Sequence, residues 1–424
     1  MAVSLCLFED FGYRKLLPLT YTRPVYHLRC GIGSLAEKIR QVYAPEQTFY
    51  HCRPGLAEIL AVNLPGASIN QISGETCLLI NGRLLATPDL ATTIPLQGED
   101  CLYTSGDDLV AARISGDHIR KLAEKISSGP LSADLFAVDR TEETDLTLVD
   151  YPWKLVQHNG DQIGIDWGLF RYQAGLKGQV DEGVAMLGKD NIFIDDGARI
   201  KPGAVLDAEG GPIIISAGAT IFPNAVIEGP VFIGPQSLIK FGAKIHEGTT
   251  IGEVCKVGGE VEESIIHSYS NKQHDGFLGH AYLGMWVNLG ADTNNSDLKN
   301  NYGHVKVYVD GEMVDTGLMF VGLTMGDHSK SSINTMFNTG TVVGVSCNIY
   351  GGGFPPKFVP SFSWGGSQGM EEYHFDRAAE TARAMMARRK VIFSSAEENL
   401  YREIFHQTAS QRTMLKYSQG IDLP

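Results

Sequence analysis

The segment from His274 to Tyr302 contains the side chains of this sequence that are best suited to chemistry. It holds His274, Asn288 and the adjacent pair Asn301-Tyr302. A histidine ionises near neutral pH, so it can accept a proton from an attacking group, and amide and phenol groups can hold a polar substrate in place. The segment therefore predicts general-base chemistry. The alternative is that His274 is an exposed loop residue without a chemical role.

The other polar residues of this region are interpreted as structural or surface groups. They are His280, His304, His328, Asp292, Asn294, Asn295 and Asp297. The last four form one polar loop, and a metal site there is an alternative left open, because carboxylate and amide oxygens are common ligands of hard cations. We assign no metal site from the sequence.

A repeat of six residues runs through the middle of the chain and must position this segment. A period of six fits neither the 3.6-residue turn of a helix nor the two-residue alternation of a strand. It predicts a coil of short strands joined by turns, in which each aliphatic residue stacks on its equivalent one coil away. After Val257 the period is interrupted, and we expect it to resume at Phe277, Leu283 and Leu289. The aliphatic residues that carry the repeat are Ile194, Ile200, Leu206, Ile215, Ile221, Ile227, Ile233, Ile239, Ile245 and Ile251.

The sequences on either side of the repeat have different patterns. Apolar runs at 3–8, 77–80 and 109–114 predict strands, and 33–42 and 118–125 predict helices, which together indicate an α/β layer with a mainly parallel sheet. From about residue 371 the pattern becomes helical, with a capping box expected at Ser395 and Glu398. We therefore expect three parts: an α/β domain at 1–185, a β-helix at 186–366 and a helical tail at 367–424.

Composition excludes several classes of protein. The 35 basic and 49 acidic residues give a formal net charge of −14, which argues against binding nucleic acid or an anionic membrane, although a local basic pocket for a small anion remains compatible. Hydrophobic residues make up 43% of the chain, enough to bury a core. The seven scattered cysteines contain no CxxC pair, and the sequence shows no signal peptide or apolar run of membrane-spanning length. We expect a cytoplasmic protein with reduced thiols.

The six-residue repeat resembles the hexapeptide repeats of left-handed parallel β-helices. Within it, the His274–Tyr302 segment resembles the acetyltransferase half of the bifunctional N-acetylglucosamine-1-phosphate uridyltransferase/glucosamine-1-phosphate acetyltransferase family, whose motif reads His-x-x-Tyr-Leu-Gly, then Val-Asn-Ile-Gly-Ala-Gly, then Asn-Tyr. The resemblance implies that His274 is the catalytic base and that Asn288 belongs to the catalytic site. It also implies that Asn301, Tyr302 and Lys306 contact the substrate, whereas Phe277 departs from the family's tyrosine.

The N-terminal part resembles the sugar-nucleotidyltransferase signature, through the run from Arg14 to Pro24 that contains Leu-Leu-Pro-Leu-Thr. Three features depart from it: residues 8–12 replace the glycine-rich turn, Val25 replaces a lysine, and Arg83 stands where the family has an aspartate that holds Mg²⁺. A guanidinium cannot ligate a cation. Glu9 or Asp10 holding the metal instead is left open. The candidate nucleotide-binding residues are Arg14, Lys15, Arg23 and Arg83.

These resemblances imply a divergent member of the bifunctional family. The expected activity is acetyl-CoA-dependent N-acetylation of an amino sugar phosphate or nucleotide-linked amino sugar by a homotrimer, beside a degenerate nucleotidyltransferase domain. One alternative is an active uridylyl or thymidylyl transferase that uses the β-helix as a scaffold, and a second is a non-catalytic sugar-nucleotide-binding protein. The acceptor sugar, the nucleotide base and the acyl chain stay open.

Overall fold

The structure, a computed structural model, describes residues 4–417 of the chain. Its contacts divide the chain into two units, which are described separately. The first unit extends to Tyr151, apart from residues 17–19 and 30–32, which belong with the second unit. The second unit otherwise begins at Pro152. The expected domain boundary between residues 185 and 186 stays a prediction, and residues 418–424 of the expected tail lie outside the described residues.

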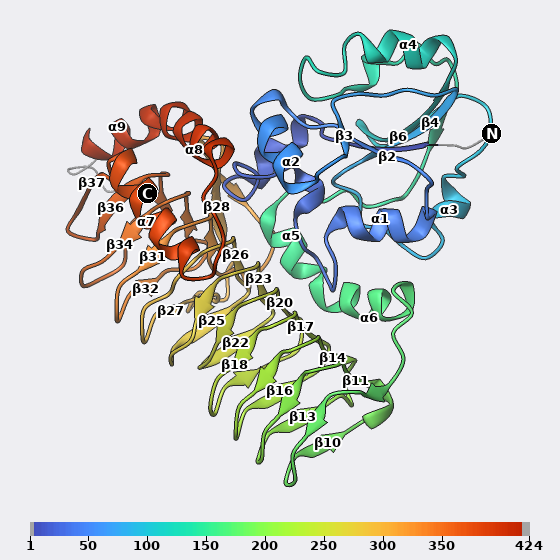
Figure 1. Cartoon of the computed structure of the whole chain (residues 1–424). Helices are drawn as coiled ribbons and strands as arrows, with labels where there is room; N and C mark the ends of the chain where they lie inside the picture. The colour runs from blue at the N-terminus through green and yellow to red at the C-terminus, as the bar shows by residue number, and fades with distance from the viewer. Residues whose placement is uncertain (1–3, 418–424) are drawn as a thin grey trace. The chain divides into compact units, whose positions relative to one another are not determined.

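The first unit is built on a seven-stranded sheet with the order β3-β2-β1-β4-β6-β5-β7 (Figure 1). Strands β3, β2, β1 and β4 are parallel, whereas β6 runs antiparallel to both β4 and β5. Its strands are β1 (Ser4–Phe8), β2 (Thr48–Tyr50), β3 (Ser68–Ile69), β4 (Thr76–Asn81), β5 (Cys101–Ser105), β6 (Asp108–Ser115) and β7 (Thr141–Glu143). Its helices are α1 (Leu35–Tyr43), α2 (Ala57–Asn63), α3 (Leu90–Thr93) and α4 (Asp117–Ala123), with 3₁₀ turns η1 (Phe11–Leu16), η2 (Val25–His27), η3 (Pro54–Leu56) and η4 (Ala133–Leu135).

The three strands predicted in this unit are therefore present, and so are both predicted helices. The central strand β1 is buried along its whole length, as expected for a parallel strand with both faces covered. Helix α1 begins with a capping box, in which the Ser34 side chain and Glu37 satisfy each other's backbone N–H groups.

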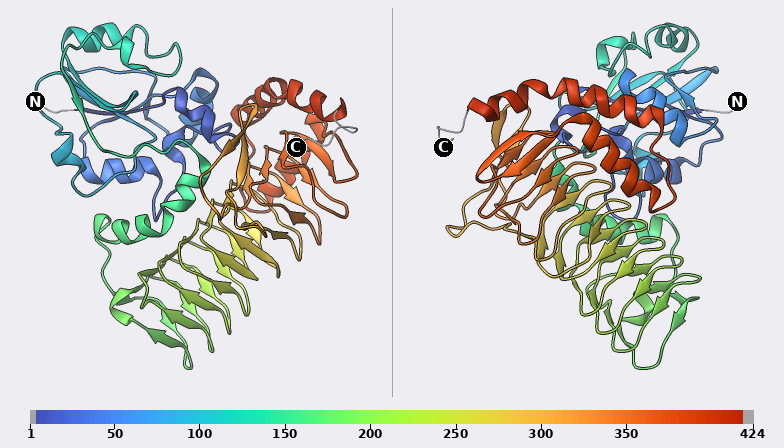
Figure 2. Two further views of the ribbon diagram at one scale, coloured as in Figure 1. Left: turned by 180° about the vertical axis from the view of Figure 1, so that it is seen from behind. Right: turned by 60° about the vertical axis from the view of Figure 1, so that its left-hand side comes forward.

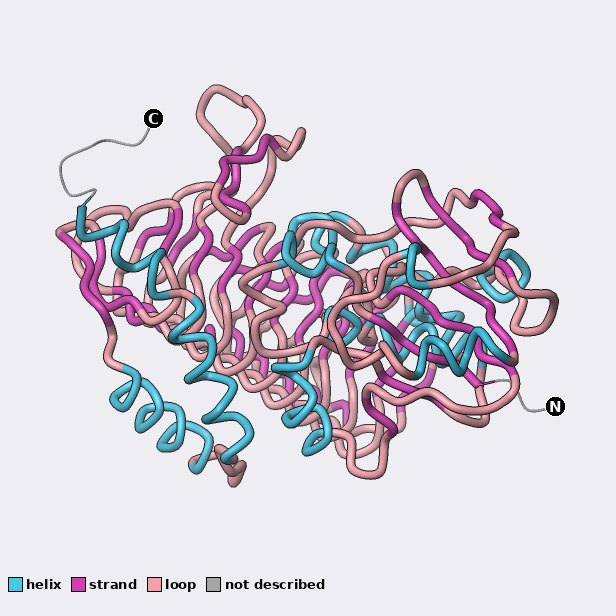
Figure 3. The backbone as a smooth tube through the Cα atoms, turned by 90° about the horizontal axis from the view of Figure 1, so that it is seen from above, coloured by secondary structure: helices cyan, strands magenta, loops and turns pink. Residues whose placement is uncertain are grey.

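The second unit is a parallel β-helix of short stacked strands, which Figure 2 shows from two sides and Figure 3 shows as strands separated by loops. The expected solenoid is thus confirmed. One face is the ten-stranded sheet of β8 (Gly175–Leu176), β11 (Ile192–Ile194), β14 (Ile213–Ile215), β17 (Val231–Ile233), β20 (Thr249–Ile251), β23 (Ile265–Ile266), β26 (Tyr282–Leu283), β30 (Thr324–Met325), β33 (Val342–Val343) and β35 (Phe358–Val359).

The second face includes the strand of Asn271, which pairs with Asn288, and is called the outer polar sheet below. It contains β9 (Gln179–Val180), β12 (Arg199–Ile200), β15 (Thr220–Ile221), β18 (Leu238–Ile239), β21 (Lys256–Val257) and β24 (Asn271–Lys272), and continues through β31 (Lys330–Ser331), β34 (Asn348–Ile349), β36 (Ser363–Gly366) and β37 (Gly369–Glu372). The third face contains β10 (Ala185–Leu187), β13 (Val205–Asp207), β16 (Val226–Glu228), β19 (Lys244–Ile245), β22 (Glu260–Glu262) and β25 (Phe277–Gly279), followed by β27 (Asn294–Asn295) and β32 (Met336–Phe337).

The aliphatic residues predicted at intervals of six, from Ile194 to Ile251, are all buried in one continuous core. The expected restart of the period at Phe277 is wrong, because Phe277 is only half-buried and Leu278 is the residue that joins the core. Leu283 and Leu289 are buried as predicted. The period changes here because the coils after Val257 have shorter turns, so a fixed interval of six no longer matches the interior positions.

One corner of the β-helix is formed by residues with a left-handed backbone. Tyr269, Trp286 and His328 occupy this corner in three successive coils, with φ values of 61°, 60° and 58°. The N–H of each donates to a carbonyl of the preceding coil, from Glu253, Ser268 and Met285 respectively. A non-glycine residue in this conformation costs on the order of 1 kcal/mol or more, so the inter-coil hydrogen bonds and packing must hold it there.

The remaining elements of the second unit precede, interrupt or follow the coils of the β-helix. Helices α5 (Pro152–Gln157) and α6 (Asn159–Leu169) precede it, the 3₁₀ turn η5 (Lys189–Asn191) lies in its early coils, and the hairpin of β28 (Lys306–Val309) and β29 (Glu312–Asp315) is inserted between β27 and β30. The tail forms α7 (Phe375–Ala387), α8 (Ser395–Gln407) and α9 (Ala409–Tyr417). The capping box of α8 is Ser394 with Glu397, one residue before the predicted pair, because Ser394 is the residue with the extended cap conformation.

Two further observations concern the whole described chain. All seven cysteines are buried and free, as the scattered spacing predicts. In the stretch from residue 4 to residue 417, no helix has both the length and the apolar character needed to cross a membrane.

Candidate functional site

A column of polar side chains crosses successive coils of the outer polar sheet. Lys256 pairs with Asn271, Asn271 with Asn288, and Asn288 with Lys330. Asn271 Nδ2 lies 3.4 Å from Asn288 Oδ1. Because alternate residues of a strand point to opposite faces and the residues after Lys256 and Asn288, Val257 and Leu289, are in the core, these polar side chains point outward. Asn288, predicted from the sequence, thus lies within an extended polar surface.

His274 lies in the exposed turn between β24 and β25. Its main-chain carbonyl oxygen accepts a hydrogen bond from Lys272 Nζ at 2.9 Å. Lys272 is 2% exposed and also donates to the carbonyl of Gly258 at 3.1 Å. Burial lowers the pKa of Lys272 to about 8. The buried lysine therefore fixes the backbone of the turn and leaves the His274 side chain toward solvent.

The structure brings His274 and Asn288 to neighbouring coils without direct contact. His274 is three residues beyond Asn271, the partner of Asn288 in the ladder. Three extended residues span at most about 10 Å and neighbouring strands lie about 5 Å apart, so the Cα atoms of His274 and Asn288 are within about 15 Å. Two side chains with a small substrate between them can bridge that distance. Lys330, one coil beyond Asn288, donates to the carbonyl of His328 at 2.6 Å, and burial lowers the pKa of Lys330 to about 8.

The predicted residues Asn301, Tyr302 and Lys306 lie on the inserted segment that carries the β28–β29 hairpin. All three are exposed, and Tyr302 has a left-handed backbone with φ 55°. Asn301 Oδ1 accepts from the N–H of Gly303 at 3.1 Å. No described contact joins these residues to His274 or Asn288, so their role as substrate contacts stays a prediction.

The polar loop considered for a metal is occupied by its own hydrogen bonds. Asp297 Oδ2 lies 2.9 Å from His280 Nδ1, and Asn295 pairs with both backbone groups of Gly279. Over residues 4–417, the group that gathers three possible ligand atoms within 4.8 Å is a different one, Glu228 with His246 and Glu247. Glu228 is exposed there, and exposed acidic groups commonly gather without a metal.

Sequence reasoning missed the contribution of the C-terminal tail. The rings of Trp286 and His328 are stacked with centroids 5.9 Å apart, and Tyr401 of α8 meets the His328 ring edge-on at 5.5 Å. Just after α7, Arg389 Nη2 donates to Asn271 Oδ1 at 3.1 Å. The tail therefore packs against the outer polar sheet beside Asn288. A possible signal was the run Arg388-Arg389-Lys390 directly after an amphipathic helix.

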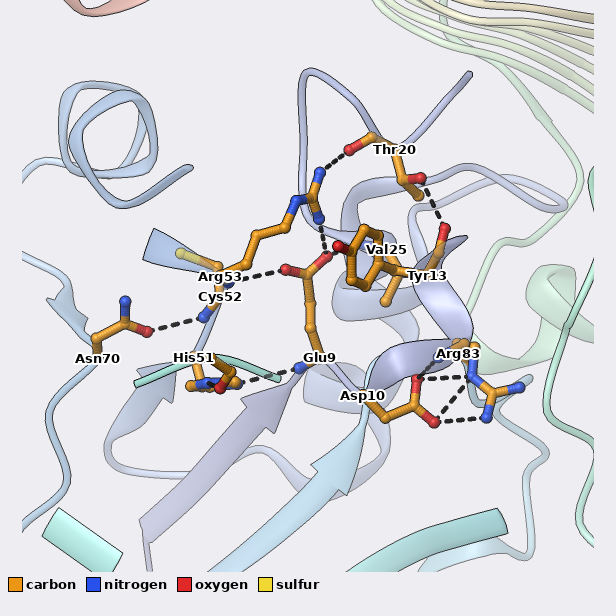
Figure 4. A network of polar contacts seen from close by, with 12 residues as sticks. Glu9, Asp10, Tyr13, Thr20, Val25, His51, Cys52, Arg53, Asn70 and Arg83 are labelled. Carbon is orange, nitrogen blue, oxygen red and sulfur yellow. Dashed lines mark hydrogen bonds and ion pairs between the residues drawn. The ribbon is translucent and has the colours of Figure 1, made fainter. Parts of the chain in front are cut away.

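In the first unit, Asp10 and Arg83 form a buried ion pair at the ends of β1 and β4 (Figure 4). Arg83 Nε and Nη2 donate to the Asp10 carboxylate at 2.9 and 2.5 Å, and Nη2 also lies 2.9 Å from Asp108. Asn81 Nδ2 and the N–H of Gly12 complete the donors around Asp10. A side chain at position 12 would clash with the guanidinium, so Gly12 is needed for this approach.

Glu9 is equally surrounded by donors. Its carboxylate accepts from Arg53 Nη1 at 2.7 Å and from the N–H groups of Val25 and Arg53, each at 3.0 Å, as Figure 4 shows. Burial raises the pKa of Glu9 although Arg53 opposes the shift. Both carboxylates considered as replacement metal ligands, Glu9 and Asp10, are thus neutralised by arginines. This donor set does not fit a divalent cation.

The other predicted nucleotide-binding residues have different environments. Arg14 and Lys15 are exposed on η1, where the Lys15 ammonium lies 5.6 Å from the centroid of the Tyr151 ring. Arg23 is buried, at 7% exposure. Their positions leave Arg14 and Lys15 accessible to a ligand, whereas Arg23 and Arg83 face the interior.

The chain is similar to several known proteins. Residues 5–173 match the model of a family described as sugar nucleotidyl transferase. The chain is 26% identical over 195 residues to the bifunctional protein GlmU of Synechococcus sp. (strain CC9311), a match that covers 45% of this chain and 38% of that protein. It is 29% identical over 217 residues to the bifunctional sugar-1-phosphate nucleotidylyltransferase/acetyltransferase of Sulfurisphaera tokodaii, covering 51% of each. The matched regions thus span about half or less of these relatives.

Among solved structures, a UDP-N-acetylglucosamine acyltransferase covers 59% of this chain and 83% of its own, with 14% sequence identity and a TM-score of 0.26.

Proposed function

The chain is a divergent relative of the bifunctional GlmU proteins, and on this premise we propose that it is a transferase of sugar-nucleotide biosynthesis. The proposed reaction is acetyl transfer from acetyl-CoA to the amino group of an amino sugar phosphate or a nucleotide-linked amino sugar. The observation that carries this proposal is the position of His274, on an anchored and exposed turn one coil away from Asn288.

In the proposed reaction, the amine of the sugar attacks the thioester carbonyl. His274 takes a proton from the amine as the C–N bond forms, the C–S bond breaks, and the departing thiolate of CoA receives a proton. Asn288 would orient the acceptor, and a backbone N–H of the coil would stabilise the oxyanion that develops on the carbonyl. Asn301, Tyr302 and Lys306, on the inserted segment, would contact the sugar from the side.

We propose that the first unit binds a uridine or thymidine sugar nucleotide and transfers nucleotides poorly. Exposed Arg14 and Lys15 would contact phosphates. The buried pair of Asp10 with Arg83 supports the loss of nucleotidyl transfer. The Arg83 guanidinium stands where a metal-binding carboxylate is expected, and it forms an ion pair with the nearest carboxylate, that of Asp10. No step through Mg²⁺ is proposed.

A second function is favoured by one finding, the match of residues 5–173 to the sugar nucleotidyl transferase family. In this alternative the first unit makes a sugar nucleotide and the β-helix only assembles the subunits. In either case we propose a homotrimer, because parallel β-helices present flat faces that can pack in threes around one axis. For the acetyl transfer alone, we propose that CoA is held between neighbouring coils where two subunits meet.

One experiment separates the alternatives. One set of reactions contains acetyl-CoA with a series of amino sugar phosphates and nucleotide-linked amino sugars, and thiol release is followed. A parallel set contains UTP or dTTP, Mg²⁺ and a series of sugar 1-phosphates, and pyrophosphate release is followed. The buried cysteines give a low background with a thiol reagent. Thiol release alone supports acetyl transfer, and pyrophosphate release alone supports the second function. Calorimetric binding of a sugar nucleotide with neither release supports a non-catalytic binding protein and contradicts both.

A further inference from the structure

Four basic side chains gather on the outer polar sheet, where the turn after α7 lies. Lys240 and Lys256 come from neighbouring coils, since the Lys240 N–H donates to the carbonyl of Val257 at 2.8 Å. Arg388 and Arg389 come from the end of α7, and Arg389 reaches Asn271, the strand partner of Lys256. The four residues are called the basic cluster below.

The positive charge of the basic cluster is not balanced by ion pairs with carboxylates of the described residues. Within residues 4–417, none of its four side chains forms an ion pair with a carboxylate, although the chain as a whole carries an excess of 14 acidic groups. Burial lowers the pKa of Lys256, and the neighbouring cations Arg389, Lys240 and Arg388 lower it further. Like charges held together in this way repel each other, and a bound anion would remove that repulsion.

A simpler reading explains only part of the cluster. Basic residues are common at helix C-termini, where they interact favourably with the helix dipole, and this accounts for Arg388 and Arg389. It does not account for Lys240 and Lys256, which belong to strands and turns of the coil. Nor does it account for the contact of Arg389 with Asn271, which directs the guanidinium to the sheet.

We propose that Lys240, Lys256, Arg388 and Arg389 form a binding site for a phosphate or diphosphate group of a small molecule. The arginines offer planar forks of N–H donors that match phosphate oxygens, and the lysines add point charges. The turn after α7 supplies two of the four basic residues, so the C-terminal tail completes the site. Phe241, 64% exposed and 5.7 Å from the Lys240 ammonium, offers a flat apolar surface beside the cluster on which a nucleotide base can stack.

The site adjoins Asn288 through Asn271. In the proposed acetyl transfer, the phosphate held by the basic cluster would position a substrate next to the transfer site. This positioning role is the one part of the inference that rests on the proposed function. The existence of the anion site is independent of that reaction.

The test is calorimetric titration of the full chain at low salt with three probes: inorganic pyrophosphate, glucosamine 1-phosphate and ADP. Lys256→Met and Arg389→Met are each expected to weaken binding about tenfold or more, since each removes a charge-assisted hydrogen bond. Lys244→Met is the matched control, because Lys244 is an exposed lysine of the next sheet that pairs with Glu260. Tighter binding of ADP indicates a nucleotide diphosphate as the source, and tighter binding of glucosamine 1-phosphate indicates a sugar phosphate.

Two results would overturn the proposal: no binding of any probe at millimolar concentration, or equal binding by the wild type and both variants. Arg389→Lys keeps the charge and guards against misfolding, but it loses the planar fork of N–H donors, so it is expected to bind less tightly than the wild type and more tightly than Arg389→Met. Acetyl transfer is measured on the same proteins. If the variants weaken probe binding but the wild type transfers no acetyl group, the proposed function is rejected and the anion site is kept. If the wild type transfers acetyl groups but the variants bind the probes as tightly as the wild type, the anion site is rejected and the proposed function is kept.

Discussion

The ammonium group of Lys272 donates a hydrogen bond to the carbonyl oxygen of His274 at 2.9 Å, from inside the coil. In the neighbouring coils the equivalent interior positions are filled by Val257 and Leu289. A lysine at such a position costs desolvation energy that an aliphatic residue would not. The benefit is a turn tied to the preceding coil through Gly258, which holds the backbone of His274 in one place.

The first prediction concerns how this lysine makes the free energy of unfolding depend on pH. Burial lowers the pKa of Lys272 from 10.5 to about 8, so the unfolded chain holds the proton more tightly than the folded chain. The free energy of unfolding should therefore rise between pH 8 and pH 10.5, by on the order of 3 kcal/mol from this group. Urea unfolding at pH 7.5 and 10 should show this rise in the wild type and its loss in Lys272→Met. An unchanged pH dependence in the variant would contradict it.

The second prediction concerns the proposed base. His274→Ala should reduce acetyl transfer by about 10²-fold or more and leave the unfolding midpoint unchanged, because the side chain is exposed and outside the core. His304→Ala, an exposed histidine on the inserted segment, is the control and should keep activity. His328, by contrast, is 3% exposed and packs among Trp286 and Tyr401, so its replacement should lower stability. Normal turnover in His274→Ala would reject the assignment.

The third prediction concerns the buried pair in the first unit. Arg83→Met should lower the free energy of unfolding by about 3 kcal/mol, because the Asp10 carboxylate loses its partner in a buried place. Asp10→Asn in the same background should restore part of the loss. Arg140→Met, which removes an exposed arginine, should change stability by less than about 1 kcal/mol. Denaturant unfolding of the wild type, Arg83→Met, Asp10→Asn and the double variant gives the coupling energy, and additive effects of the two substitutions would argue against the pair.

The fourth prediction is acid sensitivity of the first unit. His51 is fully buried, with Nδ1 accepting from the Glu9 N–H at 3.2 Å, and burial lowers its pKa to about 4. The unfolded chain binds the proton at higher pH, so stability should fall as the pH drops from about 6.5 toward 4. Between pH 7 and 5 this group should cost about 2 kcal/mol. His51→Gln should flatten that slope in fluorescence-monitored unfolding, and an identical slope would show that other groups are responsible.

The fifth prediction is oligomeric state. Light scattering at micromolar concentration should give the mass of three chains, because the flat faces of the coil are the surfaces most suited to packing against copies. A monomer under these conditions would count against a CoA site between subunits.

The sequence was most informative where one physical rule repeats. Each coil buries one aliphatic residue per side, so the ladder from Ile194 to Ile251 was readable from spacing alone. The rule fails after Val257 because the turns shorten and because Lys272 takes an interior position. A charged residue there interrupts the hydrophobic pattern although the coil continues.

The candidate site was only partly predictable. His274 and Asn288 followed from a local motif. The contacts of Arg389 with Asn271 and of Arg83 with Asp10 join residues far apart in the chain, and no spacing rule connects them. Arg83 is the instructive case, since its departure from the family pattern was visible but its partner was not.

The stacking of the β-helix also bears on how the protein is made. Each coil pairs only with the coils before and after it, so a coil can form soon after it leaves the ribosome, on the template of the one already in place. During synthesis the newest strands present open hydrogen-bonding edges, which are sites for pairing with other chains. Strand β37 turns back antiparallel on β36 and α9 packs close to it, so the edge at β36 is covered only after β37 and α9 have been translated.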